Sequence, residues 1–277
     1  MLVSPVPGNT TASGTALINA LAGISSPSST NRWLLKIEPG IYDLGTAKLP
    51  MRSWVDIEGS GIGVTTIRGN ISSGDATIHG ASDAELRMLT VENYANADGA
   101  TAMRNDSASP RIYRVKFTVP GGTWGVRNLS STPLIEECEV NVTAINGSLN
   151  AYGISYRGTL PGTRSSILRT KITVSGSSAS NSGVSTRDGL FVTEIRDSQI
   201  TVFGGTESRG IYAFNELTWS GTETLKVRTT DISAYSGSSA SYGMDFGTGT
   251  SANIDITGSK VWGHVSSTTY GIRQDGS

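Results

Sequence analysis

The sequence predicts a single right-handed parallel β-helix of the all-β class, with a short capping helix at the N-terminus. Three observations predict it: an internal repeat of about thirty residues, an alternation of apolar and polar residues that is typical of strands within each repeat, and connections rich in Gly, Ser and Thr. The 277 residues are 36% hydrophobic, enough for a substantial core, and this argues against general disorder. Only 16% of them are charged.

The first mark of the repeat is a glycine that follows an aromatic or small residue and precedes an apolar one. Its six copies lie 27 to 33 residues apart, at Gly125, Gly153, Gly183, Gly210, Gly243 and Gly271. A second mark, apolar-x4-apolar-x-apolar, runs in phase with the first, as in Ile167/Ile172/Val174. A repeat of this kind cannot bury its apolar face alone, so successive copies must stack. Their strands are then parallel and about 4.8 Å apart.

The two ends of the chain differ from the repeats. Residues 12–22 are predicted to form the capping helix, with Ser13 as N-cap and Leu17 and Leu21 at helical spacing. We therefore assign residues 1–51 to the cap and first coil and residues 52–277 to the remaining coils. The end at Tyr270-Gly271-Ile272 opens a coil without a cap, which predicts a truncation there and an edge available for self-association.

Residues 34–69 resemble the first coils of pectinesterases and of the wider pectin-lyase-like superfamily. The resemblance is carried by the segments Lys36–Tyr42, Val55–Gly63 and Thr65–Gly69, and Leu89–Asn93 looks like the next coil. Segments such as Asn105–Pro110 also look like the repeats of exported bacterial β-helix proteins. The resemblance implies a right-handed β-helix and a carbohydrate-related role.

The catalytic motifs of these families are missing. Pectinesterases resemble one another in two runs that supply paired aspartates for nucleophilic and acid/base roles, and neither run occurs here. Where the second might fall, Glu137–Ile145 contains no aspartate. The runs typical of polygalacturonases are absent too, and Asp231 and Asp255 are too scattered for a calcium-dependent lyase site. We predict no catalytic residues, no cofactor and no metal site.

Net charge and hydropathy exclude some classes of binding partner. A net charge of −1 argues against nucleic acid, because binding to phosphates needs a cationic surplus. No apolar run approaches the roughly 20 residues that span a bilayer, so no membrane is expected. Met1–Pro5 does not begin a signal peptide, yet the composition favours export. We expect a secreted or cell-surface protein whose export signal lies outside this sequence, with Cys138 as a buried thiol.

A candidate ligand surface follows from the repeat. Counting from each glycine, the next residue is expected to point inward and the one after it outward. The outward second and fourth places hold Arg127, Arg157, Arg187, Tyr212, Phe214, Asp245 and Arg273. Guanidinium forks and aromatic faces suit the carboxylates and rings of sugars, which predicts a polysaccharide partner along one stripe. The alternative is a row of ordinary solvated strand positions.

Three functions remain open from the sequence. The leading hypothesis is a non-catalytic secreted or surface β-helix scaffold that binds glycans or serves adhesion. A polysaccharide lyase or hydrolase with an unrecognised site is the enzymatic alternative. A phage tail-spike-like shaft is the third, and stable trimerisation would distinguish it.

Overall fold

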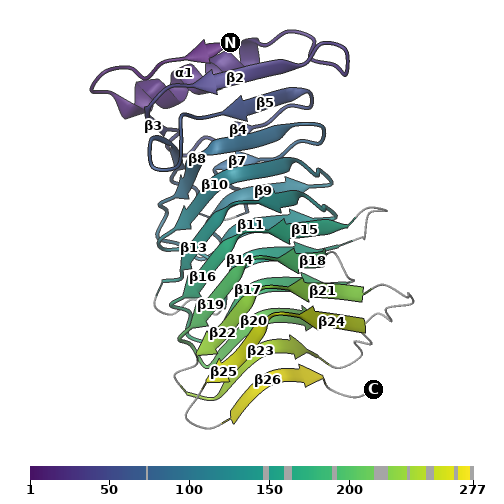
Figure 1. The fold of residues 1–277 in the computed structure, drawn as a ribbon. Helices are drawn as coiled ribbons and strands as arrows, with labels where there is room; N and C mark the ends of the chain where they lie inside the picture. The colour runs from purple at the N-terminus through teal and green to yellow at the C-terminus, as the bar shows by residue number, and fades with distance from the viewer. Residues whose placement is uncertain are drawn as a thin grey trace.

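A computed structural model describes residues 1–72, 74–145, 150–158, 164–188, 192–214, 224–235, 238–247, 253–264 and 268–274. They form a rod of stacked coils, about seven turns of right-handed parallel β-helix, as predicted. Figure 1 shows helix α1 (Thr10–Gly23) at the N-terminal end of the rod and strand β26 (Thr268–Gln274) at the other. Residues 275–277, part of the predicted uncapped end, lie outside the described residues.

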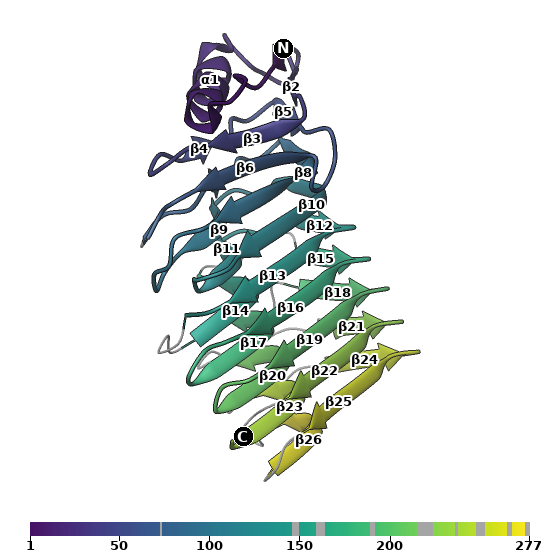
Figure 2. The same ribbon diagram turned by 90° about the vertical axis from the view of Figure 1, so that its left-hand side faces the viewer.

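A seventeen-stranded parallel sheet covers two sides of the rod, which we call its first and second limbs (Figure 2). The first limb contains β2 (Trp33–Ile37), β5 (Val55–Glu58), β12 (Leu134–Glu136), β15 (Ser165–Leu168), β18 (Val192–Arg196), β21 (Thr224–Arg228) and β24 (Asn253–Thr257), with β1 (Leu2–Val3) paired to β2. The second limb contains β3 (Gly40–Asp43), β6 (Thr65–Gly69), β13 (Glu139–Thr143), β16 (Lys171–Ser175), β19 (Gln199–Phe203), β22 (Asp231–Tyr235) and β25 (Lys260–His264). Strands β8 (Glu85–Asn93) and β10 (Arg111–Val119) run through both limbs.

A nine-stranded parallel sheet forms the third side. Its strands are β4 (Leu49–Pro50), β7 (Ile78–His79), β9 (Thr101–Asp106), β11 (Trp124–Leu129), β14 (Asn150–Arg157), β17 (Ser180–Arg187), β20 (Glu207–Phe214), β23 (Ala240–Phe246) and β26. Each of the six repeat glycines lies in one of these strands, from β11 to β26. This sheet therefore carries the most regular part of the repeat.

The apolar marks stack as predicted. Ile135, Ile167 and Ile195 pair in register along the first limb, and Val140, Ile172 and Ile200 do so along the second. All six are fully buried. The ladder of the second limb lies directly against the glycines across the core.

The six glycines form one column, which confirms the prediction that successive copies of the repeat stack. A Cβ on Gly153 would lie 2.4 Å from Cγ2 of Ile172 and 2.5 Å from the carbonyl oxygen of Gly183. The equivalent clash recurs at each of the other copies up to Gly243. Only glycine lets the nine-stranded sheet approach the second limb this closely.

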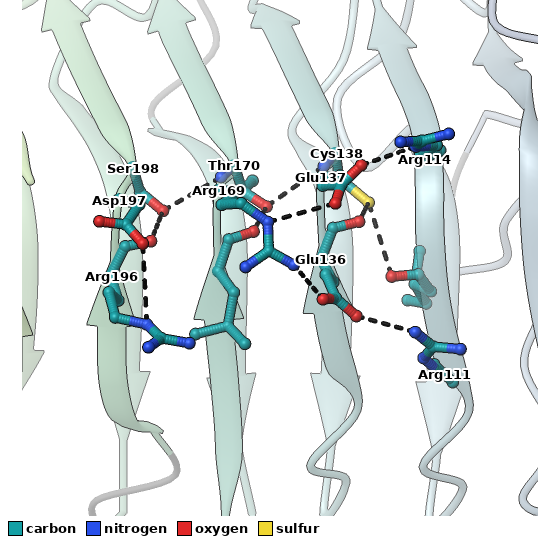
Figure 3. A network of polar contacts seen from close by, with 12 residues as sticks. Arg111, Arg114, Glu136, Glu137, Cys138, Arg169, Thr170, Arg196, Asp197 and Ser198 are labelled. Atoms are coloured by element: carbon teal, nitrogen blue, oxygen red, sulfur yellow. Dashed lines mark hydrogen bonds and ion pairs between the residues drawn. The ribbon is translucent and has the colours of Figure 1, made fainter.

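The two limbs meet at a sharp corner where one residue per coil adopts the left-handed conformation. These residues are Met88, Arg114, Glu137, Arg169, Asp197, Thr229 and Gly258, with φ between 46° and 61°. The residue after the left-handed one carries a small polar side chain in successive coils, beginning with Cys138, Thr170 and Ser198. Thr170 Oγ1 accepts a hydrogen bond from the Cys138 amide (3.3 Å), and Ser198 Oγ accepts one from the Thr170 amide (3.1 Å), as Figure 3 shows.

The same corner carries ion pairs and the buried cysteine. Glu136 bridges Arg111 and Arg169, and Glu137 bridges Arg114 and Arg169 (Figure 3). Cys138 is buried as predicted, and burial raises the pKa of its thiol to about 12. The thiol is therefore a packing group and is not poised as a nucleophile.

The capping helix begins earlier than predicted. It spans Thr10–Gly23, and its N-cap is Asn9, whose side chain accepts a hydrogen bond from the Ala12 amide at 2.9 Å. Ser13 is therefore not the N-cap; it is buried one turn further on and donates to the Asn9 carbonyl at 2.8 Å. In the described part of the chain, no helix is long and apolar enough to cross a membrane.

Candidate functional site: the outer face of the nine-stranded sheet

The glycine column decides which side chains face outward. Gly125 and Val126 both point into the core, because a Cβ on Gly125 would meet Val140 and Val126 itself is fully buried. The chain therefore bends at the glycine. The residue before it and the second and fourth residues after it face outward.

The predicted site residues lie on this face, in two neighbouring columns and not in one stripe. Arg127, Tyr212, Asp245 and Arg273 belong to the column of second residues, which also includes two serines. Arg157, Arg187 and Phe214 belong to the column of fourth residues. Arg127 and Arg157 are offset by two residues along their strands, because Arg127 pairs with Ser155.

The sequence analysis missed a third outward column, formed by the residues that precede the glycines. They are Trp124, Tyr152, Ser182, Arg209, Tyr242 and Tyr270. The signal was present, since an aromatic or small residue before the glycine defined the repeat. Simple alternation gives no reason for two consecutive inward positions, and so it left this column unassigned.

Strands β11, β14 and β17 form a basic hollow of about 100 Å³. Its lining residues are Trp124, Arg127, Tyr152, Ser155, Tyr156, Arg157, Ser185 and Arg187. The rings of Trp124 and Tyr152 are nearly parallel, with centroids 6.1 Å apart. The Arg127 guanidinium lies 4.4 Å from the centroid of Trp124, where the ring face favours a cation.

Positive charge in the basic hollow is poorly compensated. Among the described residues, no carboxylate lies within ion-pair distance of Arg127. Partial burial and then the charge of Arg104 lower the pKa of Arg127, although the charge of Asp106 opposes them. Arg157 and Arg187 share one aspartate, Asp188, at 3.7 and 3.9 Å. The hollow therefore favours an anionic ligand.

Strands β20, β23 and β26 carry a paired cluster instead, formed by Glu207, Arg209, Asp245 and Arg273. Asp245 was expected at the surface, but its side chain is fully buried. Arg209 Nε donates to one carboxylate oxygen at 2.6 Å, and Arg273 Nε donates to the other at 2.8 Å. Burial alone would lower the pKa of Arg209, but its hydrogen bond to Asp245 and the charge of Glu207 raise it overall.

The guanidinium groups of the paired cluster also cover aromatic rings. Arg209 lies 4.4 Å from the ring centroid of Tyr212, and Arg273 lies 4.3 Å from that of Tyr242. Asp245 thus holds two arginines against two tyrosines. Its oxygens are occupied, so it is a positioning residue and not an exposed acid.

Both oxygens of Asp245 accept hydrogen bonds from guanidinium groups, so the carboxylate is not available as a nucleophile. Within the described ranges, no group of three or more His, Cys, Asp or Glu residues could hold a metal ion. The arginines, hydroxyls and aromatic rings of the hollow can hold a polar, anionic ligand.

Comparisons with known proteins find similarity in structure only. No family model matches the sequence, and no curated protein matches it. The solved structures that the chain is similar to include the Dettilon tailspike protein, at 12% identity and a TM-score of 0.48 over 93% of this chain. They also include a pectin methylesterase from carrot, at 15% identity and a TM-score of 0.44, covering 86% of this chain and 83% of that protein.

The chain spans 59% of the length of the Dettilon tailspike protein. A protein of Geobacillus virus E2 is similar at 14% identity and a TM-score of 0.44, over 96% of this chain and 61% of that one. We take no activity or ligand from any of these likenesses. The structure itself is a right-handed parallel β-helix, and the comparisons support no statement beyond the fold.

Proposed function

We propose that this protein is a non-catalytic β-helix that binds an acidic polysaccharide on the outer face of the nine-stranded sheet. The observation that carries the proposal is the guanidinium of Arg127, partly buried between aromatic and basic neighbours with no carboxylate partner among the described residues. Holding such a charge away from water is unfavourable unless something compensates for it. An anionic ligand would do so.

The layout of the face favours a chain-like ligand. Arg127, Arg157 and Arg187 come from successive coils, which are spaced about 4.8 Å apart along the rod. A uronic acid carries a carboxylate that can accept two parallel hydrogen bonds from one guanidinium group. Ser155 and Ser185, in the same hollow, offer hydroxyls to the sugar. We place the protein outside the cell or on its surface, where such polysaccharides occur.

The proposal is tested by calorimetric titration with polygalacturonate and alginate oligosaccharides. We expect binding that weakens at high salt, because ionic contacts are screened. Arg127→Gln combined with Arg157→Gln should raise Kd at least tenfold and leave the melting temperature nearly unchanged. Arg114→Gln combined with Arg196→Gln, on the seventeen-stranded sheet, is the matched control and should bind as the parent does.

Three outcomes would overturn the proposal. Equal binding by both double variants would make the arginine face a solvated surface. Shortening of the oligosaccharides, or release of methanol from methylated pectin, would show an enzyme. If no acidic glycan binds and the protein forms stable trimers, a shaft of the tail-spike type becomes the better description.

A further inference from the structure

The second limb carries a separate group of aromatic side chains on its outer face, near the C-terminal end of the rod. Phe203 ends β19, Tyr235 ends β22 and His264 ends β25, and the three pair in register. Trp262 lies two residues before His264 on the same outer face. We call these four residues the aromatic platform, and we propose that it binds a ring of a neutral sugar chain.

Three rings of the platform are nearly parallel, and its three largest side chains are exposed. Tyr235 and His264 are stacked at 9° with centroids 5.0 Å apart, and Trp262 lies 5.9 Å from His264 at 14°. Phe203, Tyr235 and Trp262 expose 44, 43 and 50% of their surfaces. Large aromatic residues this exposed, on three consecutive coils, form a patch of the kind that marks a binding surface.

The platform differs from the aromatic groups of the nine-stranded sheet in one respect that bears on sugar binding. There, a guanidinium covers Trp124, Tyr212 and Tyr242. No described cation lies over Phe203, Tyr235 or Trp262. A ring face carries partial negative charge, and the C–H groups on one side of a pyranose are weakly positive. His264 stacks on Tyr235 and Trp262, so a sugar would stack on a ring face that His264 leaves open. No arginine competes for that face, whereas on the nine-stranded sheet an arginine occupies one side of the ring.

The neighbouring outward column supports a neutral ligand. It contains Thr173, Thr201 and Ser233, which pair in register with one another and then with Trp262. Hydroxyls beside bare rings match a sugar, which has apolar faces and a rim of hydroxyls. The column with ionic groups, which includes Lys171, Asp231 and Lys260, lies two residues earlier on each strand, on the side away from the ends of the strands.

The experiment follows tryptophan fluorescence while cellohexaose or maltohexaose is added. We expect quenching by at least one of the two, with a Kd that is the same at 50 and 500 mM NaCl, because no ion pair is involved. Trp262→Ala and Tyr235→Ala should each weaken binding at least tenfold, measured calorimetrically. The chosen variants change exposed side chains, so their melting temperatures should stay close to that of the parent.

Two controls separate this site from the acidic-glycan site. Ser175 lies in the same column as Phe203, one coil earlier. The Ser175→Ala variant should therefore bind neutral sugars as the parent does. The Arg127→Gln, Arg157→Gln protein should also keep this binding. Failure of both hexasaccharides to bind at millimolar concentration, or unchanged affinity in both aromatic variants, would overturn the proposal. A dimer that dissociates on Trp262→Ala would overturn it as well, by assigning the platform to a second copy of the chain.

Discussion

The basic hollow on β11, β14 and β17 and the paired cluster on β20, β23 and β26 have the same backbone arrangement but differ in electrostatics. Both lie on the same sheet, with the same glycine column behind them. In the hollow, Arg127 has no carboxylate partner among the described residues. In the paired cluster, Asp245 and Glu207 together balance the charges of Arg209 and Arg273. The repeat therefore sets where side chains stand, and the residue chosen at each outward place sets whether a charge is available to a ligand.

The largest effect is expected in the core, where the two regions should not differ. Ile172 lies behind Gly153 under the hollow, and Ile232 lies behind Gly210 under the paired cluster. Ile172→Asp and Ile232→Asp should each lower the free energy of unfolding by more than about 4 kcal/mol, because each buries an unpaired charge. Thr173→Asp, on the outer face, should be tolerated. Denaturant unfolding that finds Ile172→Asp and Thr173→Asp equally stable would contradict the assigned strand faces.

The next effect should separate the two regions. Asp245→Asn removes the carboxylate that Arg209 and Arg273 share and leaves only Glu207 beside Arg209. Breaking a buried ion pair in this way typically costs about 3–5 kcal/mol. Asp188→Asn, beside the more exposed arginines of the hollow, should cost less than about 1 kcal/mol. Chemical denaturation of the two variants makes the comparison. Similar small losses would mean that the paired cluster contributes no more than a surface ion pair.

Substitution of the repeat glycines by alanine should lower the stability of both regions by similar amounts. An added methyl on Gly153 or Gly210 would lie 2.4 or 2.1 Å from an isoleucine Cγ2. Gly153→Ala and Gly210→Ala should each destabilise by about 1–3 kcal/mol, the usual range for overpacking. Thermal unfolding measures both. A strong loss at only one glycine would show that the two regions are not backed by equivalent packing.

The smallest effect concerns Arg127 itself. Arg127→Gln removes a cation from beside Arg104 and Arg157, so we expect a stability change within about 0.5 kcal/mol. The same change should weaken acidic-glycan binding. A clear loss of stability, measured in the absence of ligand, would mean that Arg127 serves packing more than binding.

The β-helix and its ladders were predictable because the repeat is local and strict. The register of Ile135, Ile167 and Ile195 follows from spacing alone. The start of the capping helix was not predictable, because Asn9 and Ser13 are both good capping residues. The buried position of Ser13 depends on tertiary packing.

The candidate site was predictable only in part. Most residues of the second and fourth outward columns were identified, since they follow from alternation. The division into columns depends on the bend at each glycine, which alternation does not contain. The burial of Asp245 depends on two arginines from other coils, Arg209 and Arg273, that meet it only after the chain has coiled.

The corner between the two limbs bears on how such a rod can change in length. In each coil from Cys138 onward, the amide after the left-handed residue donates to a hydroxyl of the following coil, and the last such acceptor described is Ser259. Every one of these coils thus offers the same donor on one side and the same acceptor on the other. A whole coil can be duplicated or deleted in the gene without leaving either group unmatched, whereas a partial coil cannot. We expect natural variation in length to come in units of one coil, with ligand places gained or lost one at a time.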